Sequence, residues 1–182
     1  VWQMSDFNRI PQEKLNIYQL HFRDFTNEGT YLAAIDKLDY IKRLGINAIE
    51  TLPVSEFEGN DSWGYNPNYY FAVDKAYGTK NDYKKFVDEC HKRGIAVLGD
   101  MVLNHAFGTN PHARMYWDDA TSRPASNNPW FNVSSNFSLP GAQWGNDFNH
   151  TSLHTQAFVD SVVKFWLLEY KRINLNRRTV TV

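Results

Sequence analysis

Cysteine is almost absent from this 182-residue sequence, and so are other features that would point to particular classes of protein. The single thiol, Cys90, excludes an internal disulfide and argues against a metal site built from thiolates. No run of about 18 apolar residues occurs, so the sequence predicts no segment that spans a membrane. The N-terminus has no signal-peptide pattern. A processed secreted chain and a cytoplasmic chain would both look like this, so the compartment is unknown.

Strong charge of either sign is also missing. The formal net charge is -1, and Lys and Arg form no long run, which argues against a nucleic-acid partner held through phosphate contacts. A doubly wound nucleotide-binding domain would need a Gly-rich phosphate loop after its first strand, and residues 21–24 (HFRD) stand there instead. Aromatic residues, in contrast, make up 15% of the chain. Several lie among Asn and Asp, which suits binding to sugar faces, nucleobases or peptides.

The first 98 residues alternate between strand-like and helix-like patterns. We expect strands over residues 16–25, 46–54 and 95–98, with helices over 30–44 and from Lys80 or Asn81 to Gly94. Thr30 suits the start of the first helix and Gly45 its end. Residues 55–79 form a long connection of the kind that is often functional. Strands joined through helices are parallel, and right-handed crossovers wind them into an open sheet or a barrel.

The pattern changes in the second half. Residues 106–152 are rich in Asn, Ser, Pro, Gly and Trp, and they predict an irregular inserted subdomain. Helical spacing returns over residues 154–170, where Phe158 and Val162 begin an apolar stripe. We therefore divide the chain into a barrel part (residues 1–105), the inserted subdomain (106–152), and a helix with an atypical tail at the position of a fourth strand (153–182).

Polar residues follow the buried strand at residues 95–98. Asp100, Asn104 and His105 come where that strand ends, and α/β folds place ligand sites at the carboxyl ends of parallel strands. The alternative is that Asp100 caps a turn while Asn104 and His105 lie on a loop without a ligand. Spacing alone leaves both interpretations open.

Four stretches, in order, resemble the catalytic barrel of the α-amylase family, which are retaining glycoside hydrolases active on α-glucans. They are residues 64–67 (GYNP, with the tyrosines that follow), 100–105 (DMVLNH), 145–149 (GNDFN) and 165–171 (FWLLEYK). The similarity extends over about residues 14–171. It implies an α/β fold, the N-terminal portion of a (β/α)8 TIM barrel with strands one to three and the position of the fourth.

Three residues of this sequence match positions that bind substrate in the family. By resemblance, Tyr65 stacks under the sugar ring at the bond that breaks, Asp100 supports the floor of the site, and His105 donates a hydrogen bond to the same sugar. A pyranose has C–H-rich faces for an aromatic ring and a hydroxyl rim for polar groups. The alternative for Tyr65 is a buried loop anchor. Glu50 is expected to be a hydrogen-bonded supporting group rather than a catalyst.

The resemblance also bears on metal ions and on the tryptophans. No cofactor is required, but Asn104 matches a position that binds a structural calcium in many members, and Asp147 would supply another oxygen ligand. Calcium needs several more oxygens than these two. For Trp63, Trp130 and Trp144 we favour structural roles over stacking on sugars.

The carboxylates that perform the chemistry in this family are missing from the chain. Retaining glycosidases use two carboxyl groups about 5 Å apart, here an Asp in an Arg-x-Asp motif on strand four and a Glu on strand five. This sequence departs from the family after Lys171 and has no Asp or Glu after Glu169. A full barrel needs roughly 250 residues. We therefore expect no catalytic residue here and an N-terminal portion, truncated or altered at its end, that is inactive alone.

Two functions are consistent with these observations. The first is part of a glycoside hydrolase or transglycosylase that acts on the α-glucosidic bonds of an α-glucan oligo- or polysaccharide. The second is a non-catalytic carbohydrate-binding or assembly module on a half barrel. In either case the exposed barrel edges are expected to favour self-association.

Overall fold

A parallel sheet organises the molecule. The computed structural model describes residues 2–4, 6–139, 141, 143–170 and 174–175. The sheet has the order β1-β2-β5-β10, and every neighbouring pair is parallel. Its strands are β1 (Ile17–Leu20), β2 (Ala48–Thr51), β5 (Ala96–Gly99) and β10 (Asn174–Leu175). The predicted order of strands is therefore confirmed, and two residues of the tail take the fourth position; the rest of the tail, 171–173 and 176–182, lies outside the described residues.

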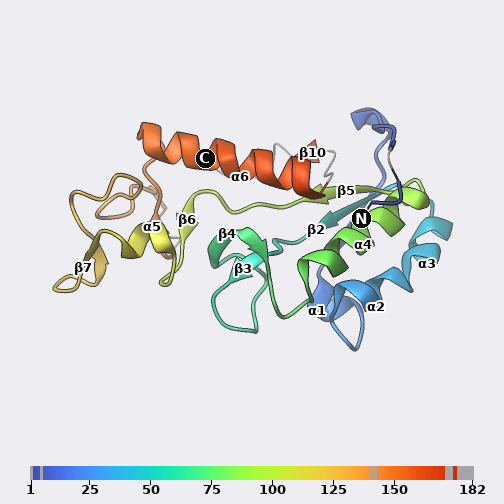
Figure 1. The fold of residues 1–182 in the computed structure, drawn as a ribbon, viewed down its shortest axis with the longest axis horizontal. Coiled ribbons are helices and arrows are strands. Elements are labelled where there is room, and N and C mark those ends of the chain that lie inside the picture. The colour runs from blue at the N-terminus through green and yellow to red at the C-terminus, as the bar shows by residue number, and fades with distance from the viewer. Residues whose placement is uncertain (1, 5, 140, 142, 171–173, 176–182) are drawn as a thin grey trace.

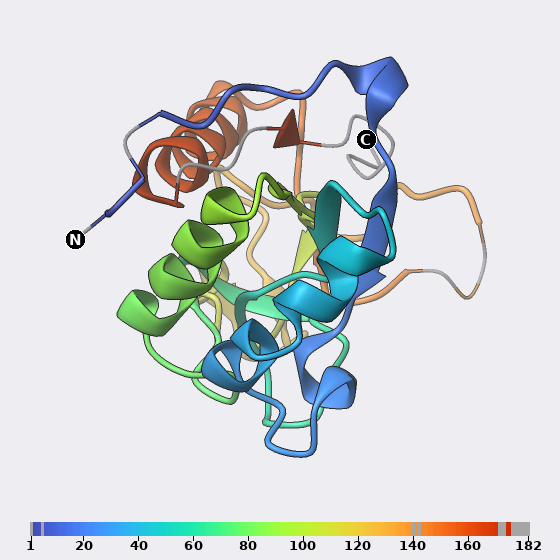
Figure 2. The same ribbon diagram turned by 90° about the vertical axis from the view of Figure 1, so that its right-hand side faces the viewer.

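Helices cover one face of this sheet. They are α2 (Tyr31–Ile35), α3 (Leu38–Arg43), α4 (Lys80–Lys92) and α6 (Leu153–Tyr170), and α4 packs between α2 and α6 (Figures 1 and 2). The helix-facing side chains of the strands, such as Ile49 and Val97, join the main hydrophobic core. On the other face Ala48, Ala96 and Leu98 contact the N-terminal segment, which contains the short 3-10 helix η1 (Gln12–Lys14). Every residue of β2 and β5 is buried, as expected for strands covered on both faces.

Local signals place α4 and α6 where the sequence predicts them. Thr79 caps α4 in a reciprocal capping box: its hydroxyl accepts from the Asp82 amide at 3.2 Å, and the Asp82 carboxylate accepts from the Thr79 amide at 2.8 Å. The inward side of α6 includes Phe158, Val162 and Trp166, spaced four residues apart. The Trp166 indole donates to the backbone oxygen of Tyr70 at 2.7 Å. Among the described residues no helix combines the length and hydropathy that a membrane span requires.

Two predicted elements are wrong in part. The strand predicted over residues 16–25 ends at Leu20, and Phe22–Phe25 form the helical turn α1. Phe22 is drawn inward by the rings of Tyr31 and Phe86, 4.8 and 4.9 Å away between centroids. The helix predicted over residues 30–44 is broken between α2 and α3, where the amide of Lys37 bonds to an oxygen only three residues back.

The connections contain regular structure of their own. Residues 55–79 include an antiparallel pair, β3 (Ser55–Phe57) and β4 (Pro67–Val73). Beyond β5, the chain runs to one end of the molecule (Figure 1). Its short elements are β6 (His105–Ala106), α5 (Pro111–Arg114), β7 (Trp117–Asp118), β8 (Arg123–Pro124) and β9 (Asn146–Asp147). Pairing joins β6 to β9 and β7 to β8.

Candidate substrate-binding site

Three of the predicted site residues meet at the carboxyl end of the sheet. Asp100 follows β5, and its amide continues the ladder by donating to the Thr51 oxygen at 3.1 Å. Asp100 and His105 are both buried, with 3% and 6% of their surface exposed. Tyr65 comes from the connection between β3 and β4 and contacts both Asp100 and His105. Parallel strands thus deliver the polar groups to one edge, as the sequence predicts.

Tyr65 is bonded to both of the other residues. Its hydroxyl donates to Asp100 Oδ2 at 2.6 Å, and its backbone oxygen lies 2.9 Å from His105 Nε2. Burial, followed by the hydrogen bond to Asp100 and the charge of Glu50, raises the pKa of the Tyr65 phenol well above its usual value. The side chain is 41% exposed even so. Tyr65 is therefore fixed at its polar end while part of its surface stays open to solvent, which is not how a buried loop anchor lies.

The bond from His105 settles which of its nitrogens carries the proton. A carbonyl oxygen only accepts, so Nε2 must be protonated in order to donate to Tyr65. Burial lowers the pKa of His105, with the bond to Tyr65 and the charge of Asp147 opposing, so the ring is neutral at pH 7. Its Nδ1 is then an acceptor. The resemblance implies that His105 donates a hydrogen bond to the sugar, but the one N–H group of its ring donates to the backbone of Tyr65 instead.

Close backbone contact fixes the loop that carries Tyr65. Gly64 has φ +89°, and a Cβ added there would lie 2.2 Å from the backbone oxygen of Pro53, a separation that no side chain tolerates. The Gly64 amide donates to the Ser62 hydroxyl at 2.9 Å. The Asn66 amide group reaches the backbone oxygen of Glu58 at 3.0 Å. Residues 61–66, which we call the Tyr65 loop, are therefore held from both ends.

Tyr70 is a supporting residue for which the sequence patterns predict no role. Its buried hydroxyl donates to the backbone oxygen of His105 at 2.6 Å, and this bond holds β6 against β4. Tyr70 points inward because it alternates along β4 with the exposed Tyr69 and Phe71. Alternation could have marked it as buried, but its partner comes from 35 residues away and leaves no local signal.

Glu50 and the tryptophans differ from expectation. Glu50 is 8% exposed, yet its carboxylate makes no hydrogen bond or ion pair to another described residue, so the predicted hydrogen-bonded role of this side chain is not seen there. Trp63 and Trp144 are 62% and 61% exposed, which contradicts a structural role for their rings. Trp130 is partly buried against the main core, as a structural residue should be.

The predicted calcium ligands are neighbours through one strand pair. Asp147 pairs with His105, and Asn104 directly precedes β6. The Asp147 carboxylate already accepts from the Asn132 side chain at 2.6 Å and the Asn136 amide at 3.3 Å. Across the described residues no three His, Cys, Asp or Glu side chains form a group that could hold a metal ion. Since calcium takes six to eight oxygens, these residues do not fit a complete calcium site.

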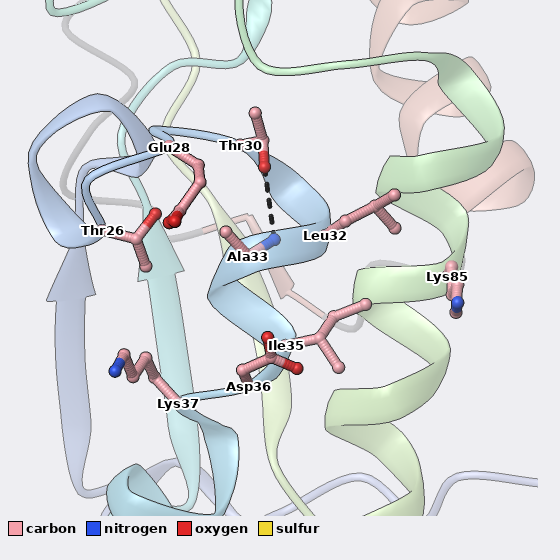
Figure 3. A pocket seen from close by; sticks show the side chains of 9 residues that line it. All are labelled: Thr26, Glu28, Thr30, Leu32, Ala33, Ile35, Asp36, Lys37 and Lys85. Atoms are coloured by element: carbon pink, nitrogen blue, oxygen red, sulfur yellow. Dashed lines mark hydrogen bonds between the residues drawn. The ribbon is translucent and has the colours of Figure 1, made fainter.

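A large cavity lies away from the candidate site. About 600 Å³ in volume, it opens beside α2 and is lined partly by Leu32, Ile35 and Lys85 (Figure 3). No aromatic residue and none of the predicted site residues line it. A smaller pocket of about 330 Å³ includes Asp147 and Gln143 and adjoins β9. Neither of these two cavities is lined by Tyr65, Asp100 or His105.

Most of this chain matches known proteins. The family model "Alpha amylase, catalytic domain" matches residues 16–173. Malto-oligosyltrehalose trehalohydrolase of Saccharolobus solfataricus is 34% identical over 93% of this chain and 28% of its own length. Isoamylase 1 of Oryza sativa subsp. japonica is 30% identical over 92% of this chain and 24% of its own length. The chain thus spans about a quarter of the length of these relatives.

Solved structures agree with the sheet and its helices. A putative α-amylase from Salmonella typhimurium superposes with a TM-score of 0.81 at 29% identity, covering 100% of this chain and 29% of that one. An α-amylase from Geobacillus thermoleovorans in complex with acarbose gives a TM-score of 0.73 at 22% identity, covering 90% and 40%. The second likeness concerns the fold alone. Together they identify the sheet as part of a TIM barrel.

Proposed function

Because the chain belongs to the family of α-amylase catalytic domains, we propose that it is the N-terminal part of a barrel that binds an α-glucan at Tyr65, Asp100 and His105. The observation that carries the proposal is the joined geometry of these three side chains. Tyr65 is bonded through its hydroxyl to Asp100 and through its backbone to His105, and it stays 41% exposed. An aromatic surface beside two buried polar groups matches a pyranose, which has apolar faces and a hydroxyl rim.

Each side chain then has a distinct role. Tyr65 supports one face of the sugar ring. Asp100 accepts hydrogen bonds from ring hydroxyls, and His105 accepts one at Nδ1 because its only proton is on Nε2. Bonds that shorten as the ring flattens toward an oxocarbenium-like state favour that state over the bound substrate. The three residues therefore contribute to rate as well as to binding in the complete protein.

The bond-breaking carboxylates are assigned to a longer protein. A retaining mechanism needs a nucleophile and an acid/base about 5 Å apart, and the family carries them on strands four and five. No Asp or Glu follows Glu169 in this sequence. The chain by itself is therefore expected to bind glucan without cleaving it, whether the complete protein hydrolyses or transfers.

The domain boundaries and the calcium ion belong to the same proposal. We keep residues 1–105 as the barrel part, 106–152 as a subdomain inserted after the third strand, and 153–182 as a barrel helix with an atypical tail at the position of the fourth strand. Of that tail, residues 171–173 and 176–182 lie outside the described residues. Asn104 and Asp147 would supply two oxygens to a structural calcium, whose other ligands must come from elsewhere. No other cofactor is required.

A second candidate is a carbohydrate-binding or assembly module without chemistry. It is favoured by β1, which lies at the end of the sheet with no described strand on its outer side. Two copies meeting at such edges would satisfy the exposed backbone groups. Activity of the complete protein separates this candidate from the first.

Titration calorimetry with maltopentaose tests the site. We expect binding to the chain, with cellopentaose, the β-linked isomer, binding at least tenfold more weakly. Tyr65→Ala should weaken maltopentaose binding about tenfold, which corresponds to about 1.4 kcal/mol. Tyr65→Phe keeps the ring but loses the bond to Asp100, so its affinity for maltopentaose should lie between those of the parent chain and Tyr65→Ala. Tyr40→Ala is the matched control, since Tyr40 is also exposed but lies on α3.

Two results would contradict the proposal. One is the absence of maltopentaose binding at millimolar concentrations by a chain that unfolds cooperatively. The other is binding that Tyr65→Ala and Tyr40→Ala weaken equally, because the sugar would then lie elsewhere.

A further inference from the structure

A second set of contacts ties the Tyr65 loop to the first strand of the sheet. The loop, residues 61–66, begins beside His21, which follows β1, and beside Arg23 in α1. Arg23 forms an ion pair with Asp61. His21 Nε2 lies 3.3 Å from the backbone oxygen of Ser62 and 3.1 Å from the hydroxyl of Tyr77. These contacts join segments about 40 residues apart in the sequence.

We infer that His21 is a positioning residue, which fixes the Tyr65 loop, and through it the sugar-facing ring, relative to the sheet. The inference rests on the proposed function of Tyr65. His21 does not touch the proposed sugar position itself. It acts through Ser62, which is three residues before Tyr65 in the chain.

His21 is itself held rigidly. Its Nδ1 lies 2.8 Å from Asp24 Oδ2, and Asp24 is bound from the other side by Arg23 Nε at 2.8 Å. Hydrogen bonds from Arg23 and His21 lower the pKa of Asp24 to about 2, so the carboxylate is ionised at neutral pH. This contact orients the imidazole so that Nε2, on the other side of the ring, faces the Tyr77 hydroxyl and the Ser62 backbone oxygen.

The contact continues from Ser62 to the ring. The Ser62 backbone oxygen meets both His21 and the Tyr77 hydroxyl, the latter at 3.3 Å. The Ser62 hydroxyl accepts from the Gly64 amide at 2.9 Å and also bonds to Asn66. Ser62 thus connects the His21 cluster to both neighbours of Tyr65. Displacing Ser62 would move the tyrosine ring away from Asp100 and His105.

A matched pair of substitutions separates positioning from general stability. His21→Gln places an amide near Nε2 and so preserves the contact with Tyr77 and Ser62. His21→Asn places an amide near Nδ1, which preserves the contact with Asp24 but removes the contacts with Ser62 and Tyr77. His154→Asn is the control, because His154 is exposed at the start of α6.

Amide hydrogen exchange, read by mass spectrometry on peptides that cover the loop, is the first measurement. One lost hydrogen bond contributes about 1 kcal/mol, so His21→Asn should speed exchange in residues 61–66 about fivefold. Exchange in α4 should be unchanged. His21→Gln and His154→Asn should resemble the parent chain. In calorimetry, His21→Asn should weaken maltopentaose binding by a similar factor, because fewer molecules hold the competent loop.

Each outcome decides one question. Unchanged loop exchange in His21→Asn, or equally faster exchange in the loop and in α4, overturns the positioning role. Faster loop exchange in His21→Asn that His21→Gln does not share supports it. Absence of maltopentaose binding to the parent chain contradicts the proposed function instead, while the exchange result still tests the contact between His21 and the loop.

Discussion

Burial controls the protonation of His105. His105 is held neutral by desolvation, and its one proton is committed to the Tyr65 backbone. His112 is also partly buried against Trp130 and Phe158, and burial lowers its pKa too. A histidine whose pKa is lower in the folded chain binds protons more readily when unfolded. Acid therefore favours the unfolded state of this protein.

The lowered pKa values of His105 and His112 make the stability of the fold depend on pH. Between the folded and unfolded pKa values the unfolded chain binds more protons, so the free energy of unfolding should fall as pH drops from about 7 to about 5. The decline should stop once both states are protonated. Urea unfolding at several pH values measures it, and His105→Gln should make the dependence shallower. His154→Gln is the control; an equal effect from it would contradict the assignment to His105.

Among the secondary-structure elements, α4 has a reciprocal capping box that defines its N-terminus. Thr79 and Asp82 satisfy each other's amides, and α4 presents Tyr83, Phe86 and Val87 to the core. Thr79→Ala removes one side of the box and should lower the free energy of unfolding by about 1 kcal/mol. Thr79→Ser keeps the hydroxyl and should lose much less. Urea unfolding of both variants measures the difference, and equal losses would mean that the hydroxyl contributes nothing.

Local sequence patterns are sufficient to predict some of the helices and strands but not others. β5, α4 and α6 are set by local signals: a short apolar run, a capping box and apolar residues four positions apart. The turn at Phe22–Phe25 is not, because aromatic rings from α2 and α4 draw Phe22 inward. An unbroken helix over residues 30–44 would place Leu32 and Leu44 on one apolar face, but both are exposed, and the helix breaks between α2 and α3. Tertiary contacts override periodicity in both places.

In the molecule as a whole, the residues of the candidate site are easier to predict than the contacts that support them. Asp100 and His105 could be proposed because they follow a buried strand, and Tyr65 because it resembles part of a family motif. The bonds that join them cross 35 and 40 residues of sequence. The supports from Tyr70 and His21 are equally distant. No periodicity encodes such contacts, because they exist only after the sheet has formed.

The edge of the sheet at β1 is expected to favour self-association. In β1 the side chain of Ile17 is 41% exposed, and no described strand lies beyond it. An unpaired parallel edge with an exposed apolar residue is a template for association. We expect sedimentation velocity to show self-association that increases with protein concentration, and Ile17→Lys to weaken it by placing a charge at the edge. Leu168→Lys, which changes an exposed leucine on α6 instead, is the control. A monomer at every concentration would show that the edge is protected in solution, and it would remove the main support for an assembly module.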